Sequence, residues 1–188
     1  MGLDVKRFPA IDGQRDFDMG HGKLYNGELA GSISHMMALT NAREKNLENV
    51  LIIEDDVIFS KTFEKVWNEA QEELPKDWDI LFFGGNHVAG FKRHSPNLIR
   101  LYGSYALQCY AVSSRSYNIV IDFMEHCVNE VFTAKEKFHP SVAADFFMAM
   151  LHNHLNVYAI HPSITWQRES FSDIQQENIS YPFLKPQN

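Results

Sequence analysis

The run Val50-Leu51-Ile52-Ile53-Glu54-Asp55-Asp56 decides the fold class. Four apolar residues in succession, three of them β-branched, are typical of a short strand that is buried on both faces of an α/β sheet. The three carboxylates that follow lie at the carboxyl end of that strand, which is where open α/β sheets bind ligands. We therefore predict an α/β fold with its functional site at this strand end.

Apolar runs of strand length alternate with helical patterns on both sides of this run. Before it, residues 5–8 predict a short strand, 14–26 a surface loop and 31–45 a helix. After it, we expect helices over 62–73, 113–128 and 141–154, strands over 78–83, 105–112 and 157–160, and a loop-rich stretch over 86–104. This alternation is the layout of a mostly parallel central sheet flanked by helices.

Length and composition restrict the class of protein. The chain has 188 residues, 45% of them apolar, which suits a single folded domain over 1–188 with an extended tail over 175–188. The net charge of -7 and the lack of any Lys/Arg-rich run argue against a nucleic-acid partner. With no apolar run near the ~20 residues of a transmembrane segment and no signal-peptide pattern, we expect a cytoplasmic protein. Cys109 and Cys127 then predict reduced thiols.

The acidic cluster is the strongest single signal. Side chains alternate along a strand, so Glu54 and Asp56 would share one face while Asp55 points away. Neighbouring like charges oppose one another's ionisation, and an all-oxygen ligand set favours Mn²⁺ or Mg²⁺ with positions open for substrate phosphates. Alternatively, Asp55 or Asp56 caps the next helix. The local string leaves both interpretations open.

Two further segments could contact a ligand. Residues 27–35 lead into a helix, whose first N–H groups can hold an anion or a sugar hydroxyl. Ser34 and His35 are adjacent and do not share a helical face, so they fail as a nucleophile and base pair. Gly84-Gly85 follows a strand and permits close backbone approach to a ligand, although glycine pairs also mark ordinary turns.

Asp145 lies in a nearly all-apolar helical segment over residues 142–148. A carboxylate is unfavourable among apolar side chains, so this residue is expected to have a specific structural or functional role. It is a candidate general base, and the alternative is an aspartate at a helix start that accepts backbone N–H groups. His152, His154 and His161 lack the spacing of a zinc site, so we interpret them as structural.

Several blocks, taken in order along the chain, resemble glycosyltransferase family 25, the lipooligosaccharide and procollagen galactosyltransferase-like group. The blocks are residues 8–13, 27–35, 51–56, 104–113, 142–145 and 160–174. Their order is more specific than any one of them. The family usually opens with a strand and a helix that carry an N-L-x-R-R-x-x-R-type string, which this chain lacks. The resemblance therefore implies an N-terminally shortened GT-A-like fold.

The resemblance also implies an activity. It implies inverting transfer of galactose or glucose from a UDP-sugar to a hydroxyl of a glycan or glycoprotein, as in lipopolysaccharide biosynthesis. Glu54 and Asp56 would bind Mn²⁺ (or Mg²⁺) at the diphosphate, and Asp145 would deprotonate the acceptor. The residues expected to line the donor or acceptor pockets are Asp12, Ser34, His35, Asp55, Gly84, Gly85, Gln167 and Asp173.

Two other functions stay open at this point. One is a non-catalytic carbohydrate- or partner-binding remnant of such an enzyme. The other is a metal-dependent phosphohydrolase, which fits less well because the chain shows no second ligand cluster for two metals.

Overall fold

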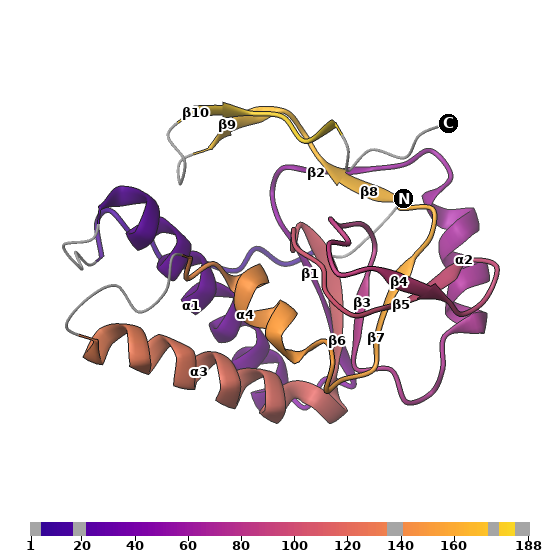
Figure 1. Ribbon diagram of the computed structural model, residues 1–188, viewed down its shortest axis with the longest axis horizontal. Helices are drawn as coiled ribbons and strands as arrows, with labels where there is room; N and C mark the ends of the chain where they lie inside the picture. Colours follow the sequence, from indigo (N-terminus) through magenta and orange to yellow (C-terminus); the bar gives the residue numbers. More distant parts are fainter. Residues whose placement is uncertain (1–4, 17–21, 135–140, 173–176, 183–188) are drawn as a thin grey trace.

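A six-stranded sheet with helices on both faces forms the body of the protein in the computed structural model (Figure 1). The structure describes residues 5–16, 22–134, 141–172 and 177–182, apart from the side chains of Lys23 and Leu24. The helices are α1 (Lys23–Glu44), α2 (Phe63–Glu73), α3 (Tyr117–Thr133) and α4 (Ala144–Leu151), with the short 3₁₀ turn η1 (Ser114–Ser116) before α3. The predicted α/β class is confirmed.

The six strands of the sheet lie in the order β1-β6-β3-β7-β5-β4. They are β1 (Asn49–Ile53), β3 (Ile80–Phe82), β4 (Phe91–Arg93), β5 (Leu98–Leu101), β6 (Cys109–Ser113) and β7 (Val157–Ile160). Of the five pairings, β3 with β7 is parallel and the other four are antiparallel. The prediction of a mostly parallel sheet is therefore wrong, because apolar runs predict strands without giving their direction.

The polar stretch over 86–104 holds two strands of this sheet that the sequence did not reveal. β4 and β5 form a hairpin that pairs with β7 through β5. All three residues of β4 are exposed, so this strand has no buried side that an apolar alternation could mark. The hairpin places a basic strand at one edge of the sheet, opposite β1.

β1 is the other edge strand, and its residues are only partly buried. Val50 and Ile52 pack on one face of the sheet, and Leu51 and Ile53 pack on the other. The prediction of a strand at 50–53 is confirmed. Its side chains are less buried than predicted, because β1 lies at the edge of the sheet and has a neighbouring strand on one side only. The acidic residues that follow are therefore accessible from the edge.

Side-chain alternation divides the apolar core between the two faces of the sheet. The α1-side core lies under α1, α3 and α4, and it includes Phe82, Tyr110 and Met124. The α2-side core lies under α2 and includes Leu81 and Phe83. Because neighbours in β3 point to opposite faces, the same three-residue strand contributes to both cores.

Several element boundaries differ from the sequence-based expectations. Residues 5–8 form no strand, and α1 begins at Lys23, within the stretch predicted to be a loop. Tyr25 and Leu29 explain the earlier start, because they are buried against α3 and α4 in a third apolar cluster. At the other end, α4 covers less than the predicted 141–154.

The chain continues past β7 with three more strands. β8 (Thr165–Gln167) pairs with β2 (Val57–Phe59), and β9 (Ser170–Ser172) pairs with β10 (Glu177–Ile179). The β9–β10 hairpin runs across the top of the view in Figure 1. β10 lies within the predicted extended tail over 175–188, and residues 175–176 and 183–188 of that tail lie outside the described residues.

Two further sequence-based expectations concern the thiols and membrane insertion. Cys109 and Cys127 are free, as predicted, and both are buried. No helix within the described residues combines the length and the apolar character needed to cross a bilayer.

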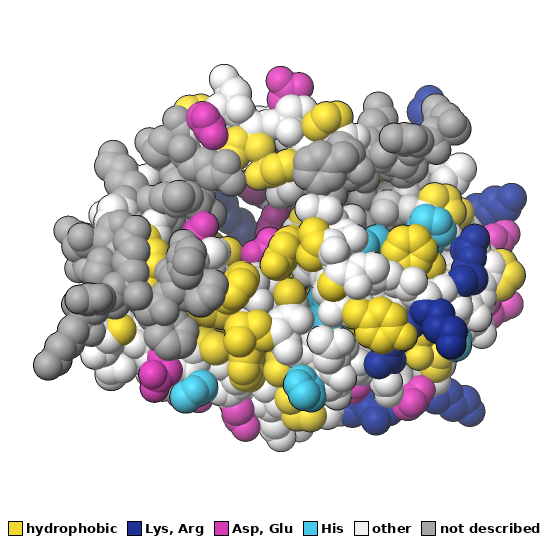
Figure 2. Space-filling model, in the orientation of Figure 1, with side chains coloured by type: hydrophobic (Ala, Val, Ile, Leu, Met, Phe, Trp, Pro, Cys, Tyr) yellow, Lys and Arg dark blue, Asp and Glu magenta, His cyan; other side chains and the backbone are white. Residues whose placement is uncertain are grey.

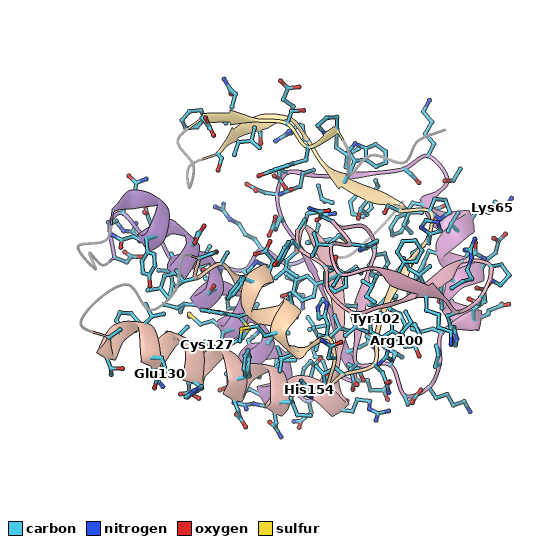
Figure 3. The ribbon with its side chains drawn as sticks, viewed as in Figure 1. Lys65, Arg100, Tyr102, Cys127, Glu130 and His154 are labelled. Carbon is cyan, nitrogen blue, oxygen red and sulfur yellow. The ribbon has the colours of Figure 1, made fainter. Side chains whose placement is uncertain are left out.

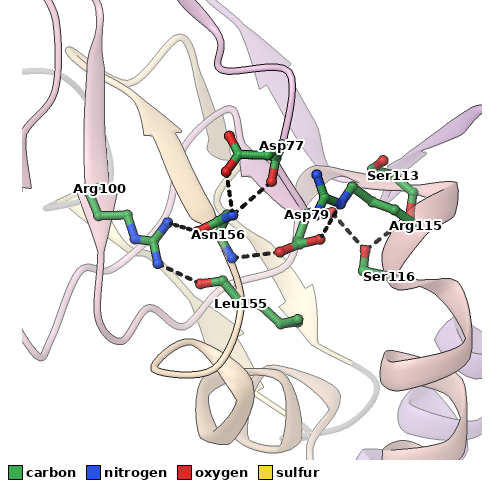
Figure 4. Close-up of polar contacts among 8 residues, drawn as sticks. All are labelled: Asp77, Asp79, Arg100, Ser113, Arg115, Ser116, Leu155 and Asn156. Carbon is green, nitrogen blue, oxygen red and sulfur yellow. Dashed lines mark hydrogen bonds and ion pairs between the residues drawn. The ribbon is translucent and has the colours of Figure 1, made fainter.

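A polar network joins β3, β7, β5 and the start of α3 at one end of the sheet (Figure 4). Asp79 is buried, and its carboxylate accepts the Asn156 N–H at 2.7 Å and lies 3.3 Å from Arg115 Nε. The Asp79 carbonyl accepts the Ser113 N–H at 2.9 Å and the Ser116 hydroxyl at 3.0 Å. One residue thus fixes the entry to β3 against two other segments.

We predict that Asp79→Ala lowers the free energy of unfolding by about 2 kcal/mol, because it removes a buried carboxylate and leaves the partly buried Asn156 N–H without its acceptor. Urea unfolding followed by circular dichroism measures this. Asp77→Ala is the matched control, since Asp77 is exposed and bonds Asn156 only from the surface. Equal losses from the two variants would contradict the role given to Asp79.

Candidate functional site

The acidic residues lie where the carboxyl ends of β1, β3 and β7 meet the amino end of β6. Glu54 directly follows β1, and its N–H donates to the Gln108 carbonyl, just before β6, at 2.9 Å. β3 ends two residues before Gly84, and Gly84 contacts β8. Figure 2 shows acidic side chains in a hollow beneath the β9–β10 hairpin. Sheet topology thus gathers segments that are far apart in sequence.

Glu54, Asp56 and Gln167 form the centre of the cluster. The Gln167 side-chain amide lies 3.5 Å from Glu54 Oε2 and 3.4 Å from Asp56 Oδ2. β2 pairs with β8 so that Val57 lies opposite Gln167, and this pairing brings the amide to the acids. Asp55 is exposed. The predicted alternation of the three acids is consistent with this arrangement, and the helix-cap alternative is wrong because β2 follows them.

Asp56 is in an unfavourable place for an isolated negative charge. Burial, followed by the charges of Glu54 and Asp55, raises the pKa of Asp56 to about 6. Its Oδ1 atom is buried and has no hydrogen-bond partner within the described residues. A positive charge at this atom would favour the ionised carboxylate.

His35 connects Glu54 to the α1-side core. Its Nδ1 lies 2.9 Å from the Tyr110 hydroxyl, and its Nε2 lies 3.4 Å from Glu54 Oε1. Tyr110 is fully buried, and burial together with Glu54 raises its pKa above the ordinary value. The phenol therefore keeps its proton. When this hydroxyl donates to Nδ1, Nε2 carries the ring hydrogen and faces Glu54.

Ser34 and Asp12 organise the segment before α1. Ser34 Oγ accepts the Ile11 N–H at 2.9 Å and donates to the Ala30 carbonyl at 2.7 Å. Asp12 is exposed, and its Oδ1 accepts the Gln14 N–H at 3.0 Å. The structure places His35 at the acids, while Ser34, on another face of the helix, holds residue 11.

Gly84 and Gly85 are glycines because other parts of this chain approach them closely. A β-carbon at Gly84 would lie 2.1 Å from the Thr165 carbonyl oxygen. One at Gly85 would lie 2.9 Å from Ser104 Oγ. The segments that approach these glycines are β8 and the loop before β6, and the approach of a ligand stays a prediction.

Asp145 lies in the first turn of α4 and bonds to the loop that leads to β6. Its Oδ2 accepts the Ala106 N–H at 3.1 Å. Ala106 has a φ of 70°, which residues with a β-carbon rarely adopt, so this bond supports an unusual backbone conformation. Ala106 is two residues from Gln108, which holds Glu54. Asp145 thus joins the same strand end, whereas Asp173 lies outside the described residues.

A group of buried polar side chains close to this loop was not predicted. Gln108 and His152 are fully buried, and neither side chain has a hydrogen-bond partner within the described chain. His87 Nδ1 lies 3.0 Å from Ser104 Oγ, while its Nε2 is buried and unpaired among the described residues. Burial lowers the pKa of both histidines to about 4, and for His152 a charge on His87 adds to the effect. No sequence spacing marks these residues as a polar group in the core.

We predict that His152 makes the fold sensitive to acid. Its pKa is about 4 when folded and about 6.5 when unfolded, so the unfolded state takes up the proton first as pH falls. The resulting stability is present above pH 6.5 and is lost as pH falls towards 4, by about 2 kcal/mol at pH 5. Urea unfolding at pH 7 and pH 5 measures the loss, and we expect His152→Leu to reduce it.

The control for this experiment is His154→Leu. His154 is exposed and is labelled in Figure 3, so its replacement should leave the acid sensitivity of the wild-type protein unchanged. The same loss of stability in His152→Leu and in the wild type would contradict the prediction.

Comparison with known proteins identifies the family. The sequence profile of Glycosyltransferase family 25 (LPS biosynthesis protein) matches residues 11–137, which include α1, the acidic strand end, the loop before β6 and α3. The chain therefore belongs to glycosyltransferase family 25.

Individual relatives agree with this assignment at low identity. A Glycosyltransferase 25 family member from Aedes aegypti is 29% identical over 103 residues, covering 45% of this chain and 17% of the relative. Procollagen galactosyltransferase 2 from Mus musculus is 30% identical over 98 residues, covering 48% and 16%. A Glycosyltransferase 25 family member from Drosophila melanogaster is 25% identical over 138 residues, covering 60% and 22%. The chain thus spans less than a quarter of the length of these relatives.

Proposed function

We propose that this chain is a metal-dependent glycosyltransferase that moves a galactose or glucose unit from a UDP-sugar to a hydroxyl of a glycan or glycoprotein, with inversion. Family membership supports the reaction class, and the galactosyltransferase among the relatives supports the hexose. The observation that carries the proposal is the convergence of Glu54 and Asp56 at the carboxyl end of β1. The mixed sheet with helices on both faces supports a GT-A-like fold.

The residues at the acidic site fit a hard divalent cation such as Mn²⁺ or Mg²⁺. Both side chains offer carboxylate oxygens, and Asp56 Oδ1 is buried without a partner in the described structure. No three His, Cys, Asp or Glu side chains of the described chain come together as a metal site. The protein would thus supply Glu54 and Asp56 and leave the remaining positions to water and substrate phosphates, as Mg²⁺ sites commonly do. Such a cation would neutralise charge on the leaving nucleoside diphosphate.

The other residues of the cluster hold the two carboxylates in place. Gln167 lies between Glu54 and Asp56 and keeps them on one side of the chain. His35, oriented by Tyr110, directs Nε2 at Glu54 and fixes its rotamer. Both are positioning residues, because they act through the carboxylates.

Asp145 is the residue we assign as general base. Oδ2 is held by the Ala106 N–H, and a carboxylate has a second oxygen that can accept a proton. Asp145 would take the proton of the acceptor hydroxyl while the hydroxyl oxygen forms a bond to the anomeric carbon of the donor sugar. The bond from that carbon to UDP breaks at the same time, and UDP leaves from the opposite face with the bonding electron pair. The product is the glycoside with its anomeric configuration inverted.

The remaining residues are assigned to the substrate pockets with different support. Asp12 and Ser34 would act by shaping the segment over α1, and Asp55 would contact ligand from its exposed position. Gly84 and Gly85 would act indirectly, by letting β8 and the loop before β6 approach. Asp173 stays a prediction from the sequence.

We predict that the folded protein binds UDP in the presence of Mn²⁺, and that Asp56→Ala weakens this binding by more than tenfold because one of two carboxylate ligands is lost. Titration calorimetry measures the affinity. Asp122→Ala, which removes an exposed carboxylate on α3, is the control and should bind as the wild type does. Failure of folded protein to bind UDP with Mn²⁺ would contradict the proposal. Glycan binding indifferent to Asp56→Ala would fit the non-catalytic alternative.

We predict that Asp145→Asn lowers turnover of a UDP-hexose by about 10²–10⁴-fold, because the amide keeps the shape of the side chain and cannot accept the proton. The affinity for UDP and Mn²⁺ should stay unchanged. Release of UDP, measured across a panel of UDP-sugars and acceptors, gives the rate, with Asp122→Asn as the control. Undiminished turnover by the Asp145→Asn variant would show that Asp145 is not the general base.

A further inference from the structure

A second polar pocket lies at the opposite edge of the sheet from β1. It has a volume of about 370 Å³ and is lined by Lys92, Arg93, His94 and Arg100 together with Tyr102 and Tyr158. Figure 2 shows dark-blue basic side chains gathered on this side of the molecule, and Figure 3 labels Arg100 and Tyr102 beside the β4–β5 hairpin. These cations are concentrated in a chain whose net charge is -7.

The pocket is separate from the acidic site. β5, which carries Arg100, lies four strand positions from β1 in the sheet, or about 19 Å at ~4.8 Å per strand. Asn156, which also lines the pocket, immediately precedes β7, whereas the acidic site lies at the carboxyl ends of the strands. A ligand in the pocket would therefore not contact Glu54 or Asp56.

Arg100 is held in a fixed orientation by neutral groups. Its Nη1 donates to Asn156 Oδ1 at 2.7 Å and its Nη2 to the Leu155 carbonyl at 2.8 Å (Figure 4). The guanidinium carbon lies 5.3 Å from the centre of the Tyr158 ring. These contacts use two of the five N–H groups and leave the positive charge unneutralised. Such a fixed guanidinium can bind an anion with little loss of side-chain entropy.

Two carboxylates near the pocket, Glu73 and Asp77, lie outside its lining. Glu73 accepts hydrogen bonds from Ser95 and Asn97, and Asp77 accepts one from Asn156. Arg93 donates to the Pro96 carbonyl at 2.9 Å, which again leaves its charge uncompensated by that contact. Glu73 and Asp77 keep their negative charge beside the pocket, whereas the lining formed by the described residues contains Lys92, Arg93 and Arg100 and no carboxylate. The positive charge is therefore concentrated on the lining itself.

Protection of a sheet edge does not account for the whole arrangement. Charged residues on an edge strand discourage pairing with another chain, and this explains Lys92 and Arg93 on β4. Arg100 lies on the next strand inward, is half-buried and is fixed by two hydrogen bonds. A residue placed in this way contributes little to edge protection and is suited to a ligand.

We propose that this pocket binds the phosphate group of a phosphorylated sugar. The cations approach from two strands, and a phosphate offers three terminal oxygens and up to two charges, whereas a planar carboxylate offers two oxygens and one charge. Tyr102, which is 40% exposed at the wall, presents an aromatic ring on which the C–H face of a sugar can pack. The inference concerns this site alone and holds whatever reaction occurs at Glu54 and Asp56.

Titration calorimetry of the full chain tests the proposal, with glucose 6-phosphate, inorganic phosphate and glucose as probes. The buffer contains about 150 mM salt to screen general attraction, and EDTA to keep divalent cations from the acidic site. We expect glucose 6-phosphate to bind more tightly than phosphate, and glucose to show no binding. Arg100→Gln should weaken the sugar phosphate at least tenfold and Lys92→Gln several-fold. Tyr102→Ala should weaken the sugar phosphate and leave inorganic phosphate unchanged.

Lys65→Gln is the matched control, because Lys65 is an exposed cation on α2 outside the pocket lining (Figure 3). It should bind as the wild type does. Lys92→Gln keeps the test valid if Arg100→Gln fails to fold, since Lys92 is exposed. Absence of glucose 6-phosphate binding would overturn the proposal, as would equal weakening by Lys65→Gln and Lys92→Gln. Binding to phosphatidylserine vesicles without binding to the sugar phosphate would also overturn it and indicate a membrane surface.

Discussion

The close placement of two carboxylates, Glu54 and Asp56, is the constraint on which the site depends. Local sequence puts them two positions apart, but four long-range contacts keep them at the sheet end. β1 pairs with β6, β2 pairs with β8, the Glu54 N–H bonds to Gln108, and His35 reaches Glu54 from α1. Since burial and mutual repulsion disfavour ionised Asp56, the rest of the fold must hold these charges against their tendency to separate.

The sheet separates two regions of opposite charge. The acidic site lies beside the β1 edge, and the basic pocket lies at the β4–β5 edge. Between them the strands contribute almost only apolar side chains, which pack under helices on both faces. This apolar separation lets a chain of net negative charge offer one site suited to a cation and another suited to an anion.

Part of the fold and part of the site could be predicted from local pattern. β1, α2 and β7 were found within a residue or so, because each combines a clear apolar period with a clear end signal. β4 could not be found, because all its residues are exposed, and the direction of β6 is not encoded in its composition. The acidic run could be read from the sequence as a candidate site, whereas no local pattern marks the buried polar side chains of Gln108 and His152 or the neighbouring His87.

The sequence by itself determined the α/β class, the family, and the acidic strand end at Glu54, Asp55 and Asp56, since these depend on neighbouring residues and on blocks in a fixed order. Tertiary structure decided which acids face one another, what reaches them and where the basic pocket forms. Gln167 lies 111 residues from Asp56 and Arg100 lies 56 from Asn156. Contacts over such separations depend on strand order and direction, which local periodicity does not specify.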